Sequence, residues 1–153
     1  MTAWIDGQIV GADVTPMPSV GVVAPFETMG AQRGEVALWR EHLVRLSATA
    51  VRLGLTFAPG PELRAAASDL LLRNGDTEGV LRLMLLPKTN GVSVVLTSRP
   101  RGPLKSVRLL PTVVERPSDA PPADLKTFPR HFYDAVLQQA QDGGADDGIV
   151  IGR

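Results

Sequence analysis

The sequence predicts an α+β fold over residues 1–115, with a mostly antiparallel sheet and two helices, followed by the start of a second α/β domain. Three observations lead to this prediction. The pair Asp6-Gly7 lies between two short runs of β-forming residues, which is typical of a tight hairpin because both turn positions favour a positive φ. Two later segments repeat apolar residues every three or four positions, as on one face of a helix. Several strand-like runs bounded by Gly or Pro follow them.

The segment after the hairpin reads as further strands. We expect one or two strands within residues 20–32, because this stretch lacks a helical period. The dipeptide Arg33-Gly34 predicts a turn into another short strand at residues 35–38.

Two helices are predicted next, at residues 39–53 and 61–74. Gly54 ends the first and Asn74-Gly75 ends the second, since these residue types tolerate the left-handed conformation that closes a helix. The expected buried stripes are Leu43, Leu46, Ala50 and Leu53 in the first helix, and Leu63, Ala67, Leu70 and Leu71 in the second.

The rest of the chain contains more strands, a linker and one helix. The block from Arg116 to Pro122 is too rich in proline for a helix or an inner strand, so we interpret it as part of an interdomain linker. The expected elements around it are strands at 80–86, 92–97 and 107–114, a helix at 130–141 and a strand at 148–151. The expected organisation is a small N-terminal domain at 1–115, a linker at 116–124 and the beginning of a second domain at 125–153.

The composition excludes several classes of function. Sixteen Lys and Arg residues balance sixteen Asp and Glu residues, which argues against nucleic-acid binding by bulk charge. The absence of cysteine excludes disulfides, cysteine nucleophiles and zinc-thiolate sites. The apolar runs are too short to span a membrane, and the N-terminus lacks a signal-peptide pattern. We therefore expect a cytoplasmic protein with no metal site and with neither a nucleic-acid nor a membrane partner.

Lysine is scarce, with three lysines in the whole chain. Lys88 and Lys105 lie in or beside turns that contain Gly and Pro, and we interpret them as solvated. Lys126 differs, because it follows the linker in an apolar setting between Leu125 and Phe128. From the residues alone it is either an amine with a chemical role or an ordinary lysine at the end of a strand.

Arg45 is a second candidate, one turn after His42 on the first predicted helix. It is either a solvated helix arginine or an anion clamp, because a guanidinium binds phosphate through two hydrogen bonds.

Three stretches, taken together in this order, carry a family resemblance: Trp4-Ile5-Asp6-Gly7 with Phe26-Glu27-Thr28-Met29; Glu41-His42-Leu43-Val44-Arg45-Leu46 with Leu53-Gly54-Leu55; and Leu125-Lys126-Thr127 with Gly144-Ala145-Asp146-Asp147. The chain resembles the N-terminal portion of a class IV aminotransferase, as a divergent member. This family comprises the fold type IV pyridoxal-phosphate enzymes, among them branched-chain and D-amino-acid aminotransferases and aminodeoxychorismate lyases.

The resemblance singles out five residues and implies a role for most of them. Lys126 matches the lysine that forms a Schiff base with pyridoxal 5'-phosphate and moves the proton at the substrate Cα, and Arg45 matches the arginine that holds the cofactor phosphate. Phe26 matches an aromatic residue near the substrate, Arg82 is expected to face the substrate, and Arg130 matches an arginine of some lyase members. The implied substrate is a small amino acid or amino-chorismate compound, and the implied assembly is a homodimer.

The chain also departs from the family pattern. Residues 19–25 lack the Asp-Arg-Gly and Gly-Asp-Gly motifs that usually precede Phe-Glu-Thr, and Leu86-Pro87-Lys88 stands where many members have Thr-Arg-Gly. The family continues beyond the length of this chain and supplies there the acid that pairs with the pyridine nitrogen. We therefore expect the chain to be incomplete and a poor catalyst alone. The alternatives are a non-catalytic relative that binds a cofactor or partner, and an unrelated α+β domain.

Overall fold

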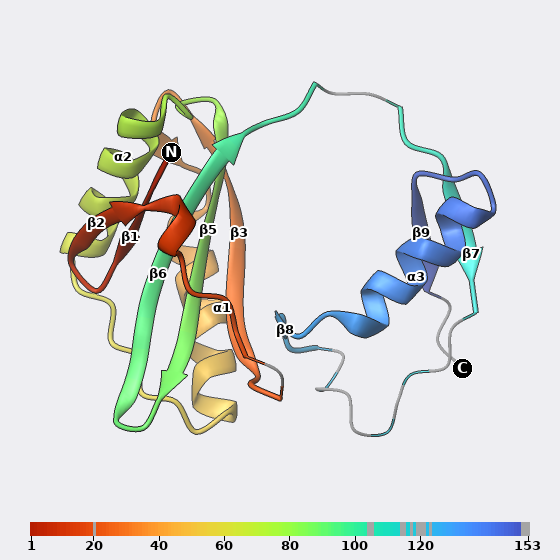
Figure 1. Ribbon diagram of the computed structural model, residues 1–153, viewed down its shortest axis with the longest axis horizontal. Helices are drawn as coiled ribbons and strands as arrows, with labels where there is room; N and C mark the ends of the chain where they lie inside the picture. The colour runs from red at the N-terminus through yellow and green to blue at the C-terminus, as the bar shows by residue number, and fades with distance from the viewer. Residues whose placement is uncertain are drawn as a thin grey trace. The chain divides into compact units, whose positions relative to one another are not determined.

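The computed structural model describes residues 1–19, 21–103, 106–113, 116, 118, 122 and 124–150 (Figure 1). The chain divides into two compact units: unit 1 is Met1–Gly102 with Ala123–Pro129, and unit 2 is Pro103–Pro122 with Arg130–Arg153. The domain bounds expected from the sequence stay a prediction. The structure does not describe most of the expected linker, nor Val20, Lys105 and Ile151, so the expectations for these positions lie outside the described residues.

Unit 1 is built on an antiparallel sheet with the strand order β2-β1-β6-β5-β3-β4, and β8 pairs with the first residues of β3. The longest pairing joins β5 and β6 as a hairpin. This sheet confirms the predicted α+β class. Its strands are β1 (Thr2–Ile5), β2 (Gln8–Gly11), β3 (Ala24–Gln32), β4 (Glu35–Val36), β5 (Gly79–Lys88), β6 (Gly91–Pro100) and β8 (Thr127–Phe128), with the short 3-10 helix η1 (Ala12–Val14) after β2.

Helices α1 (Trp39–Arg52) and α2 (Glu62–Asn74) cover one face of this sheet (Figure 1). α1 packs on β3, and α2 packs on β1 and β6. Gly54 and Gly75 each have a φ of 71°, so the backbone leaves the helix at the two predicted positions. The predicted buried stripe of α2 is confirmed in full.

Two turns shape the path into and out of the first strands. Asp6 and Gly7 have φ values of 47° and 97°, which confirms the predicted hairpin turn between β1 and β2. The strand predicted at residues 35–38 is too long, because β4 ends at Val36. Leu38 has a φ of 52°, and this left-handed conformation turns the chain out of the strand and into α1.

Side chains that alternate along the strands build two separate apolar clusters. The cluster between the sheet and the helices includes Met29, Leu46, Leu70, Leu71, Leu81, Leu83, Leu85 and Leu96. The cluster on the opposite face consists of Ala24, Phe26, Met84, Leu86 and Val95, with Ile5 and Phe128 packed against it. Neighbouring residues of β3 therefore serve different faces of the sheet, which matters for the candidate site.

Unit 2 contains β7 (Leu109–Thr112), α3 (His131–Asp142) and β9 (Asp147–Val150). β7 and β9 form a parallel pair, and α3 packs on both strands. Gly148 lets them approach closely, since a Cβ there would lie 2.6 Å from Cγ1 of Val136. None of the helices in the described part of the chain is long and apolar enough to cross a membrane.

The core of unit 1 yields a stability prediction at two adjacent leucines of α2. Leu71 is fully buried, whereas Leu72 is 62% exposed. We expect Leu71→Ala to lower the free energy of unfolding by about 2–5 kcal/mol, because it removes a packed side chain and leaves a cavity. Leu72→Ala is the control and should change it by less than about 0.5 kcal/mol. Urea unfolding followed by circular dichroism measures both, and equal losses would contradict the assignment of the buried face.

Candidate functional site

The candidate site is centred on the carboxylate of Glu27 in the middle of β3. Side chains alternate along the strand, so Phe26 points to one face of the sheet and Glu27 to the face that carries α1. The Glu27 side chain is 1% exposed. A carboxylate buried to this extent requires charged or hydrogen-bonding partners.

Helix α1 supplies two of these partners. Arg45 donates from Nε to Oε1 of Glu27 at 2.6 Å and from Nη2 to Oε2 at 2.5 Å, which is a two-pronged ion pair. Nδ1 of His42 lies 2.8 Å from the same Oε2. His42 and Arg45 reach one carboxylate because residues three apart lie on the same side of a helix.

Lys126 is the third partner. Its Nζ lies 3.8 Å from Oε2 of Glu27 and 5.5 Å from the centroid of the Phe26 ring. The carbonyl of Lys126 accepts a hydrogen bond from the N–H of Phe26 at 3.0 Å, and the next residue begins β8, which pairs with β3. Strand pairing thus holds Lys126 beside two consecutive residues of β3, although about a hundred residues separate them along the chain.

The electrostatics of this cluster favour an ionised Glu27. Burial by itself raises the pKa of the Glu27 carboxyl, but the hydrogen bonds from Arg45 and His42 and the charge of Lys126 outweigh burial and leave that pKa below its ordinary value. The same ion pair raises the pKa of the Arg45 guanidinium. Glu27 is therefore a fixed negative charge that holds basic side chains around it.

Two aromatic rings form the other side of the site. The centroids of Phe26 and Phe128 lie 4.4 Å apart, with an angle of 31° between the rings. The guanidinium carbon of Arg82 lies 5.5 Å from the centroid of Phe26 and 5.4 Å from that of Phe128. The structure thus brings together Lys126, Arg45, Phe26 and Arg82, four of the residues singled out from the sequence.

The fifth residue, Arg130, belongs to unit 2, where its guanidinium carbon lies 5.6 Å from the ring centroid of Tyr133. Lys88 forms an ion pair with Asp6 at 2.7 Å and remains 54% exposed. Among the described side chains, no group of three or more His, Asp or Glu residues could hold a metal ion.

Sequence reasoning gave no chemical role to Glu27 or His42, although both lie in motifs quoted for the resemblance. Glu27 carried a signal, because it is the only charged residue in the otherwise uncharged run 24–32. A lone acid within a buried strand requires a basic partner. His42 and Arg45, three residues apart on one helix face, are candidates for such basic partners.

The family model described as amino-transferase class IV matches residues 24–153. The chain belongs to the class IV aminotransferase family. Its members depend on pyridoxal phosphate, and the match includes every residue of the Glu27 cluster. A comparison with curated proteins finds no match.

Solved structures show the same fold. The chain aligns with the branched-chain amino acid aminotransferase of Escherichia coli at a TM-score of 0.80 and 18% identity, covering 98% of this chain and 59% of that one. A protein from Legionella pneumophila assigned as a 4-amino-4-deoxychorismate lyase aligns at a TM-score of 0.76 and 20% identity, covering 94% of this chain and 59% of that one. The pyridoxal-phosphate-bound form of a hypothetical aminotransferase from Mycobacterium tuberculosis aligns at a TM-score of 0.73 and 22% identity, covering 99% of this chain and 62% of that one. The chain thus matches the N-terminal part of a fold type IV aminotransferase and spans about three fifths of these structures.

The side chains around Glu27 fit the two ends of pyridoxal phosphate. The side chain of Arg45 is 53% exposed and that of Lys126 is 38% exposed, so a ligand can reach both basic groups from solvent. A guanidinium suits the phosphate, and a primary amine suits the aldehyde. Because both groups contact the same carboxylate, one small ligand can engage them together.

Replacing the central carboxylate tests the stabilising role of the cluster. Glu27→Gln keeps the shape of the side chain but removes its charge, and we expect a loss of roughly 1.5–3 kcal/mol in unfolding free energy, as for hydrogen bonds to charged groups. Glu35→Gln is the matched control, because Glu35 is 68% exposed and pairs with Arg64 at the surface. Its loss should stay below about 1 kcal/mol. Similar losses for both variants in urea unfolding would contradict this role.

The lowered pKa of Glu27 also predicts a pH dependence. A carboxyl whose folded-state pKa lies below its unfolded-state value stabilises the fold above the unfolded-state pKa, and loses that contribution as the pH falls through the folded-state pKa. Below the ordinary value of 4.5, the wild type should therefore lose unfolding free energy faster than Glu27→Gln does. Unfolding curves between neutral and acidic pH measure the difference, and a gap that does not narrow on acidification would refute the prediction.

Proposed function

We propose that this chain carries the catalytic lysine and the phosphate-binding arginine of a pyridoxal-phosphate-dependent aminotransferase or aminodeoxychorismate lyase-like enzyme. The observation that carries the proposal is the joint contact of Lys126 and Arg45 with the buried carboxylate of Glu27. Family membership supports the cofactor, and the exposure of both basic groups supports access to it.

Arg45 is proposed to bind the cofactor phosphate. A guanidinium has five N–H donors. Glu27 receives bonds from Nε and Nη2 of Arg45, and neither of these bonds uses Nη1. Glu27 fixes the plane of the guanidinium while the exposed part of the group faces solvent, so the donors are oriented before a phosphate arrives.

Lys126 is proposed to bond the cofactor aldehyde and then to act as acid and base at the substrate Cα. When bound, pyridoxal phosphate supplies the electron sink for the bond that breaks at this carbon. Lys126 contributes an amine that would hold or release a proton, and its Nζ lies 3.8 Å from the Glu27 carboxylate. The Phe26 ring lies 5.5 Å from the amine and packs in turn against Phe128.

We propose a small amino acid or amino-chorismate substrate that contacts Phe26 and Arg82, with Arg130 as a further contact. We also propose a homodimer in the cytoplasm. The solved relatives contain a portion that this chain does not match, and we propose that turnover needs that portion.

Covalent trapping tests the proposed lysine. After the full 153-residue chain is incubated with pyridoxal phosphate and reduced with borohydride, peptide mass mapping should find the pyridoxyl group on Lys126. Lys126→Ala should remove this label, because Lys126 is the lysine held beside Glu27 and Phe26. Lys88→Ala is the matched control and should leave the label on Lys126 unchanged, since Lys88 is a surface lysine paired with Asp6.

Equal labelling of all three lysines would overturn the assignment of Lys126. Absence of any label at saturating pyridoxal phosphate would instead favour the alternative of a non-catalytic relative.

A further inference from the structure

A small pocket lies between strands β1 and β6 and the loop that joins α1 to α2, which is yellow in Figure 1. Its volume is ≈ 190 Å³. An apolar cavity of roughly 150 Å³ is large enough to hold benzene, whereas drug-sized ligands occupy roughly 300–1,000 Å³. The pocket therefore has room for one ring-sized group.

Apolar side chains form the walls of this pocket. Trp4 lies on β1, Val92 and Val94 alternate along β6, Leu63 lies in the first turn of α2, and Phe57 comes from the loop. Both aromatic residues and both valines pack against the core between the sheet and the helices, yet they are only partly buried. A ligand that covers their remaining apolar surface gains the free energy of removing it from water.

One exposed carboxylate also lines the pocket. It belongs to Glu62 in the first turn of α2, and none of the described lining residues is basic. The carboxylate lies over Gly60 of the loop, because a Cβ added to that glycine would overlap both of its oxygens. In the described part of the chain Glu62 forms no ion pair, unlike Glu35, which pairs with Arg64. The pocket therefore combines aromatic rings with a negative charge that no cation of the chain neutralises.

This combination favours a cation with an apolar body. The faces of aromatic rings attract ammonium groups, and those of tryptophan do so most strongly. A carboxylate adds its charge and accepts hydrogen bonds from the N–H groups of an ammonium. An acid would be repelled by Glu62, and an amino acid would bring its own carboxylate into the pocket together with its ammonium group. The chemistry of the pocket thus favours an amine that carries no carboxylate.

We propose that Trp4, Phe57 and Glu62 form a binding site for a small arylalkylamine. The aromatic ring of the ligand lies between the apolar walls, and its ammonium group pairs with Glu62. This site goes beyond the function proposed above and does not depend on it. None of the lining residues belongs to the Glu27 cluster, and strand β5 lies between β6 and β3 in the sheet.

The test is a titration of the full chain without cofactor, followed by NMR at the indole N–H signals of its two tryptophans, Trp4 and Trp39. Trp39→Phe assigns the two signals. The probes are benzylammonium, benzyl alcohol and benzoate, which share a ring and differ in charge. We expect benzylammonium to shift the Trp4 signal and to bind roughly five-fold or more tightly than benzyl alcohol, with benzoate the weakest. The Trp39 signal should not move, because Trp39 does not line the pocket.

Two glutamate variants separate the pocket from general charge effects. Glu62→Gln should remove most of the preference for the cation. Glu41→Gln is the matched control, because Glu41 is also an exposed acid in the first turn of a helix. Equal losses in the two variants would overturn the site in favour of bulk charge. Equal affinities of the wild type for all three probes would overturn the amine class.

A further pair of variants tests the location. Ala58→Phe should weaken binding of every probe, because Ala58 lines the pocket and the added ring fills part of it. Ala65→Phe is the control, since it adds the same ring at an exposed position of α2 outside the pocket. Undiminished binding in Ala58→Phe, or no binding of benzylammonium to the wild type, would overturn the proposal. Because the titration involves neither pyridoxal phosphate nor Lys126, its failure and a failure of pyridoxyl labelling are separate results.

Discussion

The buried carboxylate of Glu27 is the interaction on which the candidate site depends. It fixes Arg45 through two hydrogen bonds, accepts a contact from His42 and draws Lys126 to within 3.8 Å. Without such partners, an ionised carboxylate at this depth would be strongly unfavourable. The same contacts that remove this cost bring a helix residue and a residue from the far end of the chain to one point. The contacts that stabilise the buried carboxylate therefore also assemble the candidate site.

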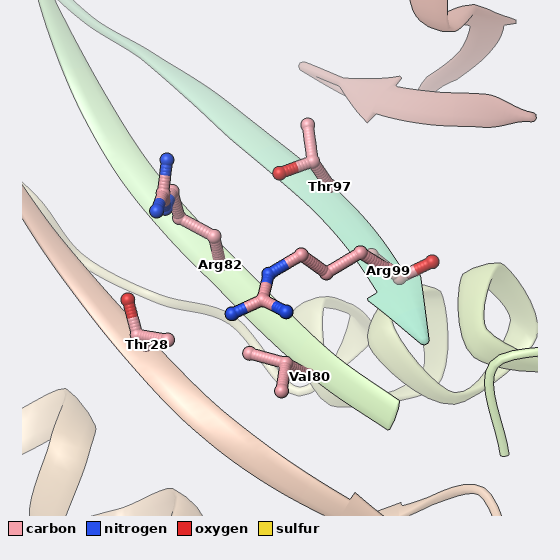
Figure 2. Close-up of a pocket in the computed structure, with 6 residues that line it drawn as sticks. Thr28, Val80, Arg82, Thr97 and Arg99 are labelled. Carbon is pink, nitrogen blue, oxygen red and sulfur yellow. The ribbon is translucent and has the colours of Figure 1, made fainter. Parts of the chain in front are cut away.

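Strand β3 connects this cluster with the other face of the sheet. Because adjacent side chains point in opposite directions, Glu27 organises the basic groups and Phe26 forms the ring wall beside them. Lys126, the residue before β8, contacts both residues. The next residue on the Phe26 face, Thr28, lines a small hollow together with Arg82 (Figure 2). Residues 26 to 28 of β3 therefore reach the aromatic rings, the basic cluster and this hollow in turn.

Local signals in the sequence were sufficient for most of the fold. Asp6-Gly7 specifies its hairpin because few residue types accept positive φ, and Gly75 closes α2 for the same reason. The strand predicted at residues 35–38 ends at Val36, because Leu38 adopts a left-handed conformation. Leucine rarely adopts this conformation, so the sequence did not predict it.

The candidate site was predictable only in part. Lys126 and Arg45 could be named from motif resemblance, but the carboxylate that joins them could not be given a role, since its contacts span distant parts of the chain. The pairing of β8 with β3, rather than local propensity, brings Lys126 beside Glu27.

The central claim is that Arg45 and Lys126 hold opposite ends of one ligand. The most direct measurement compares the equilibrium affinities of pyridoxal phosphate and of pyridoxal, which lacks the phosphate, for the wild type, Arg45→Gln and Arg52→Gln. Arg52 is the control because it is a half-exposed arginine on the same helix. The account predicts that the phosphate improves binding by roughly ten-fold or more in the wild type and in Arg52→Gln, and that Arg45→Gln abolishes most of this gain. An undiminished preference for the phosphate form in Arg45→Gln would contradict it.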